Sequence, residues 1–521
     1  MDGSGSGKSA SYSIPNAYQC LGSYVFTDPK GELYDRTAGY LKEKGYDIKV
    51  LNLVRPQYSD GYNPLMHITS ELDVDVIANT IVKGQKTEGG NADPYWDDMA
   101  EMLLKSLIYY LIATRPPEEQ NLASCAELVR AANANGGSNL LTELISALPY
   151  DHPARMYYKS IEIAPEKTYG SILSSLQSKL GKFDSKDIAE LTSTDTIDFE
   201  EIGNKKTAVY VISSDTHTAY DFLLTIFFSQ MIQQLYDYAD KNGGQLKEQT
   251  FFILDEFANI GKIPDFDKKI STSRSRKISF SVILQNVDQL EAVYEKSYET
   301  IMGNCDTHVF LGSNSFKTVE YFSKQLGEKT IDRDSISINK DKQNHRTGKS
   351  ISDNVMARAL MTPDELRRLD NDMCIIFVKG LKPVKANKFY YFKHPMAREM
   401  AAVEISHNDI GEIERGEWRK YNPYNPYVDE KEENNTSQKD LKVESLDDLF
   451  EDLDELPTKP ASAPASTNKQ ENSPSISELS FEEDAPVLPQ ESSNNNDEEY
   501  DLQKELEAKF DELFGPLDDE E

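Results

Sequence analysis

Six short runs of β-branched and aromatic residues set the strongest limit on the fold of this 521-residue chain. The runs are 22–27, 46–51, 207–213, 250–254, 278–284 and 307–311. None shows clean polar alternation, so each predicts a strand that is buried on both faces. Stretches with helical spacing, such as 32–44, 217–239 and 315–326, lie between several of them. Because strands that alternate with helices are typical of a parallel sheet, we predict a doubly wound α/β domain.

One long stretch, about 93–191, breaks this alternation with helix signals and no convincing strand. Its length suits a small domain, so we predict an all-α insertion. The α/β domain is then divided into a first part, 1–92, and a second part, 192–400.

The net charge of −33 is concentrated near the C-terminal end of the chain. Residues 429–521 carry −23 of it and leave −10 for the rest, so charge does not exclude nucleic acid as a partner of the body. We predict that 401–521 forms an acidic, largely disordered tail. Two short amphipathic segments in it, 445–456 and 501–514, are typical of helices that fold onto a partner. A purely solubilising tail is an equally good interpretation.

The sequence also indicates a cellular compartment. No run of about 18 apolar residues is present, and the start of the chain does not resemble a signal peptide. The four cysteines lie far apart without the spacing of metal ligands, which favours a reducing compartment and argues against a structural metal. We therefore expect the cytoplasmic side.

The sequence DGSGSGKS near the start of the chain matches the phosphate-loop pattern G-x-x-x-x-G-K-[ST], except that Asp2 replaces the first glycine. Lys8 would reach the β and γ phosphates of ATP, and the Ser9 hydroxyl would ligate Mg²⁺. A flexible Gly/Ser start without a function is the alternative. The predicted nucleotide-binding residues here are Gly5, Ser6, Gly7, Lys8 and Ser9.

A second signal is FFILDE, a buried strand that ends in Asp255 and Glu256. A carboxylate at this position suits a contact to Mg²⁺ through water, and the next one is placed to polarise the attacking water. Taken alone, such a pair is more often a helix cap or a solvated turn. Together with the phosphate loop, it predicts an ATP-hydrolysing site.

Two further polar positions flank the next strand. Arg274 and Arg276 precede it, and Gln285 ends it. Arg274 could act on the nucleotide of a neighbouring subunit, and Gln285 could sense the γ-phosphate. On chemistry alone, a basic surface loop and a satisfied strand-end amide are the more frequent interpretations.

In order from about Asp2 to about His394, the motifs resemble the TraG-like coupling proteins of type IV secretion and conjugation. DPKGELY and LDEFANIG carry the most specific part of the resemblance. The similarity is greatest to the branch from Gram-positive conjugative plasmids. The supporting segments are GSGSGKSASYSIPN, YVFTDPKGELYDRTAGYLKEKGYDIKVLNL, NPL at 63–65, LDEFANIGKIPDF, STSRSRKISFSVILQ and CIIFVKGLKP.

The resemblance implies a RecA-like, hexameric ATPase at the cytoplasmic face of the cell membrane. Such a protein receives a relaxase bound to single-stranded DNA, with its accessory proteins, and delivers it to the type IV secretion channel. The all-α insertion resembles a domain implicated in substrate docking.

The resemblance also assigns roles to the site residues. Lys8 and Ser9 would bind ATP and Mg²⁺, Asp255 would belong to the second acidic motif, and Glu256 would be the catalytic base. Arg274 would be the arginine finger, and Gln285 the γ-phosphate sensor. Asp28 and Lys30 would lie near the site without a firm role, and a tight turn fixed by Pro29 and Gly31 is the alternative for them.

This sequence differs from the family at its start, where the transmembrane helices and the first core strand are missing. We therefore expect the natural protein to extend upstream of Met1 and to be anchored in the membrane by that segment. Basic residues such as Lys262, Lys268 and Lys269 could follow DNA phosphates without reading sequence.

Two other functions remain open. The protein could be a docking receptor in which nucleotide only sets the conformation. It could also be a chromosome-segregating DNA translocase of the same superfamily, although DPKGELY and the insertion disfavour this. The fold does not separate these alternatives from a transfer ATPase.

Overall fold

The computed structural model describes residues 7–84, 94–134, 140–214, 220–340 and 347–423. Its centre is a five-stranded sheet in the order β2-β3-β1-β4-β5, in which every pairing is parallel. The strands are β1 (Ser23–Thr27), β2 (Asp47–Asn52), β3 (Thr207–Ile212), β4 (Thr250–Leu254) and β5 (Ile278–Val282). The predicted α/β class with a parallel sheet is therefore confirmed.

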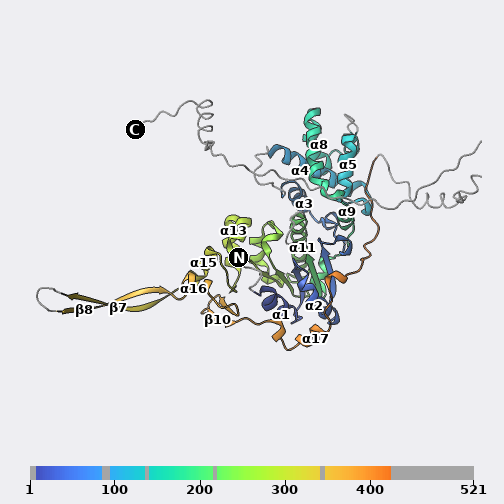
Figure 1. Cartoon of the computed structure of the whole chain (residues 1–521). Helices are drawn as coiled ribbons and strands as arrows, with labels where there is room; N and C mark the ends of the chain where they lie inside the picture. Colours follow the sequence, from blue (N-terminus) through green and yellow to red (C-terminus); the bar gives the residue numbers. More distant parts are fainter. Residues whose placement is uncertain (1–6, 85–93, 135–139, 215–219, 341–346, 424–521) are drawn as a thin grey trace, which may run out of the picture. The chain divides into compact units, whose positions relative to one another are not determined.

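The two faces of this sheet bury different side chains. Tyr24 and Phe26 point to one face, where α1 (Ile14–Ala17) and α2 (Glu32–Glu43) pack on them. Val25 points to the other face, which is covered by α11 (Asp221–Lys241). Figure 1 shows these helices on either side of the strands. Because both faces are covered, the central strands need apolar residues at every position.

Helices are the only regular secondary structure in the described part of the chain between β2 and β3. Tyr62, Leu107 and Val25 belong to the same hydrophobic cluster, so this helical region and the sheet share one core. The predicted insertion domain, 93–191, falls within this region, and its boundaries remain a prediction. The α-helices between β2 and β3 are α3 (Glu71–Lys83), α4 (Pro94–Thr114), α5 (Leu122–Ala134), α6 (Leu140–Ser146), α7 (Pro153–Glu162), α8 (Glu166–Leu180), α9 (Lys186–Leu191) and α10 (Phe199–Asn204).

The part of the chain after β5 adds a three-stranded antiparallel sheet in the order β10-β9-β6. Its strands are β6 (Thr307–Phe310), β9 (Met373–Val378) and β10 (Val384–Asn387). The prediction that 307–311 is buried on both faces was wrong, because β6 is an edge strand whose side chains are mostly exposed or half-buried. Apolar periodicity identifies a strand but not its neighbours.

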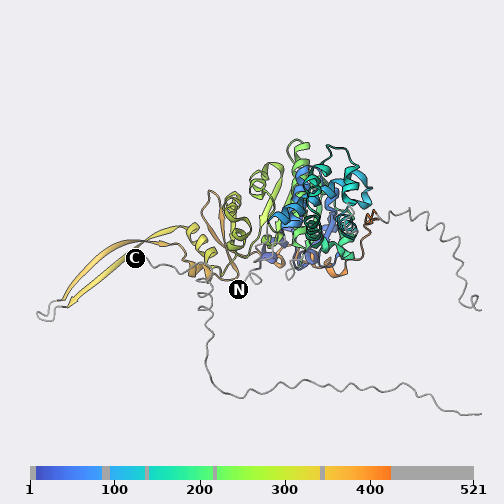
Figure 2. The ribbon, with the colours of Figure 1, turned by 90° about the horizontal axis from the view of Figure 1, so that it is seen from above.

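The second half of the described chain, after β4, also contains a long two-stranded ribbon and six α-helices. Strands β7 (Glu328–Lys340) and β8 (Thr347–Ala359) form an antiparallel ribbon of their own (Figure 2). The helices of this half are α12 (Phe266–Thr272), α13 (Val287–Tyr294), α14 (Tyr298–Asn304), α15 (Phe316–Leu326), α16 (Pro363–Arg367) and α17 (Ala397–Ala401). No helix in the described ranges is both long and apolar enough to cross a membrane.

Residues 401–423, which the sequence interpretation groups with the disordered tail, make specific contacts with the body. The His407 ring lies 2.8 Å from Asp35 Oδ1, and Arg415 donates to Glu190 at 2.8 Å. The Arg419 guanidinium donates to Glu119 at 2.7 Å. These contacts tie 401–423 to the folded body, contrary to the prediction for this stretch. The two predicted amphipathic segments lie outside the described residues.

Candidate active site

The phosphate loop and the acidic strand end meet at the carboxyl edge of the parallel sheet. Ser9 begins the first described helical turn, and its hydroxyl donates to Asp255 Oδ2 at 3.0 Å. The Lys8 ammonium lies 3.9 Å from Asp255 Oδ1. Gly7 has a left-handed φ of 69° and accepts a hydrogen bond from the Ser11 N–H at 2.8 Å, which starts the helix. The structure thus brings together residues that are far apart in the sequence.

The Lys8 side chain fits an anionic ligand. It is 10% exposed, and its Nζ has no hydrogen-bond partner within the described residues. A buried ammonium that lacks hydrogen bonds is costly, and phosphate oxygens at the N-terminal end of a helix would satisfy it. Gly5 and Ser6, which the sequence predicts to complete this loop, lie outside the described residues.

Asp255 is held in place from three directions. Its carboxylate accepts from Ser9 and from the Glu256 N–H at 3.0 Å, and its backbone carbonyl accepts from the Thr27 hydroxyl at 2.7 Å. Burial raises the pKa of Asp255, while Lys8 and Ser9 partly offset this effect. The Ser9 hydroxyl and a carboxylate are oxygen ligands that suit Mg²⁺, whose charge would favour the ionised form of Asp255.

Glu256 occupies a strained position and is oriented through both carboxylate oxygens. Its φ of 53° is in the left-handed region, which is uncommon for a residue with a Cβ. Gln285 Nε2 donates to Oε1 at 2.8 Å, and Asn259 Nδ2 donates to Oε2 at 3.3 Å. The sequence interpretation missed Asn259 and Thr27, although Asn259 lies within the LDEFANIG motif.

The two arginines before β5 differ in their surroundings. The Arg276 guanidinium makes two hydrogen bonds with Asp240, at 3.1 and 3.2 Å, and lies over the Tyr236 ring. The Arg274 side chain is 94% exposed, and Asp306 is 4.0 Å away. Arg274 precedes β5 and Gln285 follows it, so the two side chains lie at opposite ends of the strand, and in the described part of the chain no ion pair joins Arg274 to Asp255.

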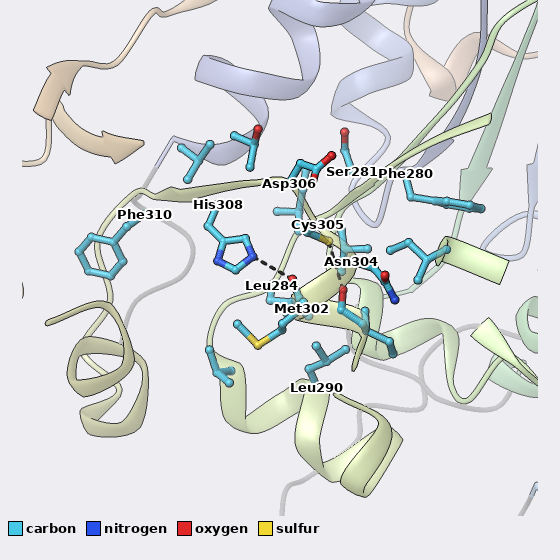
Figure 3. A pocket seen from close by; sticks show the side chains of 18 of the residues that line it. Phe280, Ser281, Leu284, Leu290, Met302, Asn304, Cys305, Asp306, His308 and Phe310 are labelled. Carbon is cyan, nitrogen blue, oxygen red and sulfur yellow. Dashed lines mark hydrogen bonds between the residues drawn. The ribbon is translucent and has the colours of Figure 1, made fainter. Parts of the chain in front are cut away.

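A cleft of about 680 Å³ lies between β5 and β6, with Phe280, Ser281 and His308 among its lining residues (Figure 3). Lys8, Arg274 and Gln285 also line it. His308 bonds the Met302 carbonyl at 3.0 Å along one wall. Strand β5 ends one sheet and β6 ends the other, and within the described ranges neither has a strand partner on its remaining edge. This explains why most of β5, predicted to be fully buried, is half-buried.

Comparison with known proteins identifies the family. The sequence profile of the family described as type IV secretory system conjugative DNA transfer matches residues 1–413. This chain belongs to that family. Its members include the coupling proteins of conjugation, so the predicted TraG-like identity and the role in conjugative DNA transfer are confirmed.

Curated relatives support the assignment. The chain is 24% identical over 433 residues to the conjugal transfer protein TraG of Escherichia coli, which covers 76% of this chain and 67% of that protein. It is 23% identical over 411 residues to the protein VirD4 of Agrobacterium fabrum, across 77% of this chain and 59% of that protein. The chain therefore spans roughly two thirds of the length of these relatives.

A solved structure supports the fold. The bacterial conjugative coupling protein TrwBdeltaN70, in its unbound monoclinic form, superposes with a TM-score of 0.54 at 18% identity. The superposition covers 75% of this chain and 84% of that chain. The RecA-like class predicted for this coupling protein is therefore confirmed.

Asp28 and Lys30, which the sequence places near the site, differ in burial. Asp28 is buried at the end of β1, and its carboxylate accepts from the Tyr34 N–H at 2.8 Å. Lys30 is exposed. Gly31, with a φ of 72°, donates to the Asp28 carbonyl at 3.2 Å, as the tight-turn interpretation requires. Burial raises the pKa of Asp28 from 3.8 to about 7.

The raised pKa predicts that Asp28 makes the stability of this coupling protein depend on pH. A folded-state pKa above the unfolded value of 3.8 gives stability that is complete below about pH 4 and is lost as the pH rises through 7. The loss is up to about 4 kcal/mol. In urea unfolding, we expect Asp28→Asn to be more stable than the parent chain at pH 8 and to keep less than half of this advantage at pH 5, within the window between 3.8 and about 7.

Asp265 is exposed, and its carboxylate pairs with Lys268. The Asp265→Asn variant is therefore the matched control. It should follow the parent chain at both values of pH. Equal differences between Asp28→Asn and the parent chain at pH 5 and pH 8 would contradict the assignment.

The proposed basic loop around Lys268 and Lys269 needs correction. Both residues lie on α12, and Lys268 pairs with Asp265 at 2.6 Å. Lys269 is half-buried, and burial lowers its pKa. Only Lys262, which is exposed in the turn before α12, keeps the predicted loop character.

Proposed function

We propose that this protein is a DNA-transfer ATPase that hydrolyses ATP to deliver relaxase-bound single-stranded DNA to the type IV secretion channel. The main support is the buried Lys8 ammonium, which lies close to Asp255 and has no hydrogen-bond partner in the described part of the chain. Beside it, Gln285 orients the Glu256 carboxylate. A phosphate anchor, a carboxylate suited to a metal and an oriented general base are the parts that phosphoryl transfer requires.

Each residue has a distinct role in the proposed mechanism. Residues 5–7 and Lys8 hold the phosphates, and Glu256 accepts the proton of the attacking water. Gln285 fixes the carboxylate of Glu256 and senses the γ-phosphate. Mg²⁺, held by Ser9 and Asp255, would neutralise charge on the phosphates.

The proposed active site is completed between subunits. Arg274 is almost fully exposed and lies at the opposite end of β5 from Gln285, which suits a residue that acts on a neighbour's nucleotide. We propose a homo-hexamer at the cytoplasmic face of the membrane, as coupling proteins work at the membrane. The proposed partners are the relaxase, its accessory proteins and the channel subunits.

A nucleotide-gated docking receptor is the second candidate. Such a receptor would bind nucleotide in the same way as the transfer ATPase and would differ only in having no ATP turnover that is coupled to transfer. A chromosome-segregating translocase is disfavoured, because the chain belongs to the conjugative transfer family.

Measured ATP hydrolysis, with and without single-stranded DNA, tests the proposal. We expect turnover that DNA stimulates and that falls to background in Lys8→Ala, because that variant lacks the phosphate anchor. Stimulation should weaken with rising salt, since the backbone contacts are electrostatic. Tight ATP binding without turnover under any condition would instead support the docking receptor.

A further inference from the structure

A pair of stacked aromatic rings lies beside the phosphate loop. A Cβ added to Gly7 would stand 3.1 Å from the Tyr390 ring, so the ring touches the loop backbone. The Tyr390 and Phe392 rings are nearly parallel, with an interplanar angle of 6° and centroids 5.3 Å apart. Phe392 is 60% exposed. A large aromatic surface therefore faces solvent next to the proposed position of the phosphates.

Hydrogen bonds hold this aromatic pair in place. The Tyr390 hydroxyl donates to Asp372 Oδ1 at 2.9 Å. The buried Lys388 donates through its backbone N–H to the Asp372 carbonyl at 2.7 Å and through Nζ to the Leu311 carbonyl at 2.8 Å. The segment is thus anchored just before β9, at Asp372, and just after β6, at Leu311, so its rings are positioned before any ligand binds.

The backbone separates Tyr390 from its neighbour Phe389. Tyr390 is extended, with φ −78° and ψ 143°, so adjacent side chains point in different directions. Phe389 packs edge-on against His394, with centroids 6.2 Å apart. Lys393 lies over the Tyr390 ring, 5.4 Å from its centroid, and adds a positive charge beside the pair. Phe389 is therefore a matched control for an exposed aromatic residue of the same segment.

We infer that Tyr390 and Phe392 form a stacking platform for the base of the nucleotide bound at the phosphate loop. The inference rests on the proposed function, because the phosphates at Lys8 bring the base within reach of the ring that touches Gly7. Bases stack on aromatic rings, and the positive charge of Lys393 suits an anionic ligand. Because every base has a π face, the platform accepts purine nucleoside triphosphates without choosing between ATP and GTP.

Calorimetric titration of the full chain with ATP, GTP and inorganic tripolyphosphate, each with Mg²⁺, tests this platform. We expect Tyr390→Ala and Phe392→Ala to weaken the affinity for ATP and GTP by about 10-fold, the smaller end of the effect of losing a stacked base. Both should bind tripolyphosphate as the parent chain does, because it has no base. Tyr390→Phe keeps the ring and should bind ATP nearly normally, as should Phe389→Ala.

The outcomes separate the platform from the proposed function. A parent chain that binds neither ATP nor tripolyphosphate would overturn both. If the parent chain binds tripolyphosphate and ATP but Tyr390→Ala and Phe392→Ala bind ATP normally, only the platform is wrong. Equal weakening of the affinities for tripolyphosphate and ATP would show that Tyr390 supports the loop through Gly7 and does not stack on a base.

A change of oligomeric mass with unchanged ATP affinity would assign the rings to a contact between copies. Phe392 is mostly exposed, so Phe392→Ala tests the platform even if Tyr390→Ala fails to fold.

Discussion

Replacing Glu256 with Gln is expected to lower the rate of ATP hydrolysis by about 100-fold to 10,000-fold, the usual contribution of a general base. Gln has the shape of Glu, and its amide oxygen can still accept the hydrogen bond from Gln285 Nε2, now 2.8 Å long. It cannot take a proton from water. ATP affinity should remain, because Lys8 and Asp255 are unchanged. Phosphate release measured beside equilibrium ATP binding separates the two effects.

The Asn259→Ala variant is the control for orientation without proton transfer. Asn259 donates to the other carboxylate oxygen at 3.3 Å, a longer contact than that of Gln285. Its loss should lower the rate much less than Glu256→Gln does. Turnover of Glu256→Gln within a few-fold of the parent chain would exclude Glu256 as the base. Loss of ATP binding in Glu256→Gln would show instead that the left-handed turn at residue 256 supports the phosphate loop.

The sequence predicted those parts of the site that depend on local chemistry. A loop that turns amides and a lysine toward phosphate, and a buried strand that ends in carboxylates, each have a local signature. In a parallel sheet the carboxyl ends of the strands lie at one edge, so the contact of Lys8 with Asp255 follows from the two motifs. The bond between Gln285 and Glu256 also requires that β5 lies beside β4, and no local pattern encodes that neighbour.

Other features depend on tertiary packing that periodicity does not carry. The Thr27 hydroxyl, at the end of β1, donates to the Asp255 carbonyl. Tyr390, which follows β10 and is far from Gly7 in the sequence, contacts the phosphate loop at Gly7. Lys269 shows a missed local signal, since Phe266 and Ile270 are spaced as the buried face of a short helix. For β5 and β6, residue type predicted strands correctly, whereas their burial depends on the cleft between the two sheets.

Replacing Arg274 with Ala is expected to lower ATP turnover by about 1,000-fold or more, the effect of losing an arginine finger. The folded chain should tolerate the change, because this side chain is 94% exposed and its nearest carboxylate, Asp306, is 4.0 Å away. An exposed ion pair of this length contributes little to stability. Thermal unfolding and ATP binding should therefore match the parent chain, while phosphate release is lost.

Arg276→Ala is the matched control, since it removes the same charge two residues away. Arg276 bonds Asp240 and covers the Tyr236 ring. Its loss should therefore lower the melting temperature, whereas the rate of ATP turnover should change little. Mixing Arg274→Ala with Lys8→Ala tests whether Arg274 acts between subunits. The first variant keeps a nucleotide site without a finger, and the second keeps the finger without a working site. Where a Lys8→Ala subunit supplies Arg274 to its neighbour, turnover should return above the level of either variant alone. If the mixture shows no recovery although the two variants assemble together, Arg274 does not act in trans.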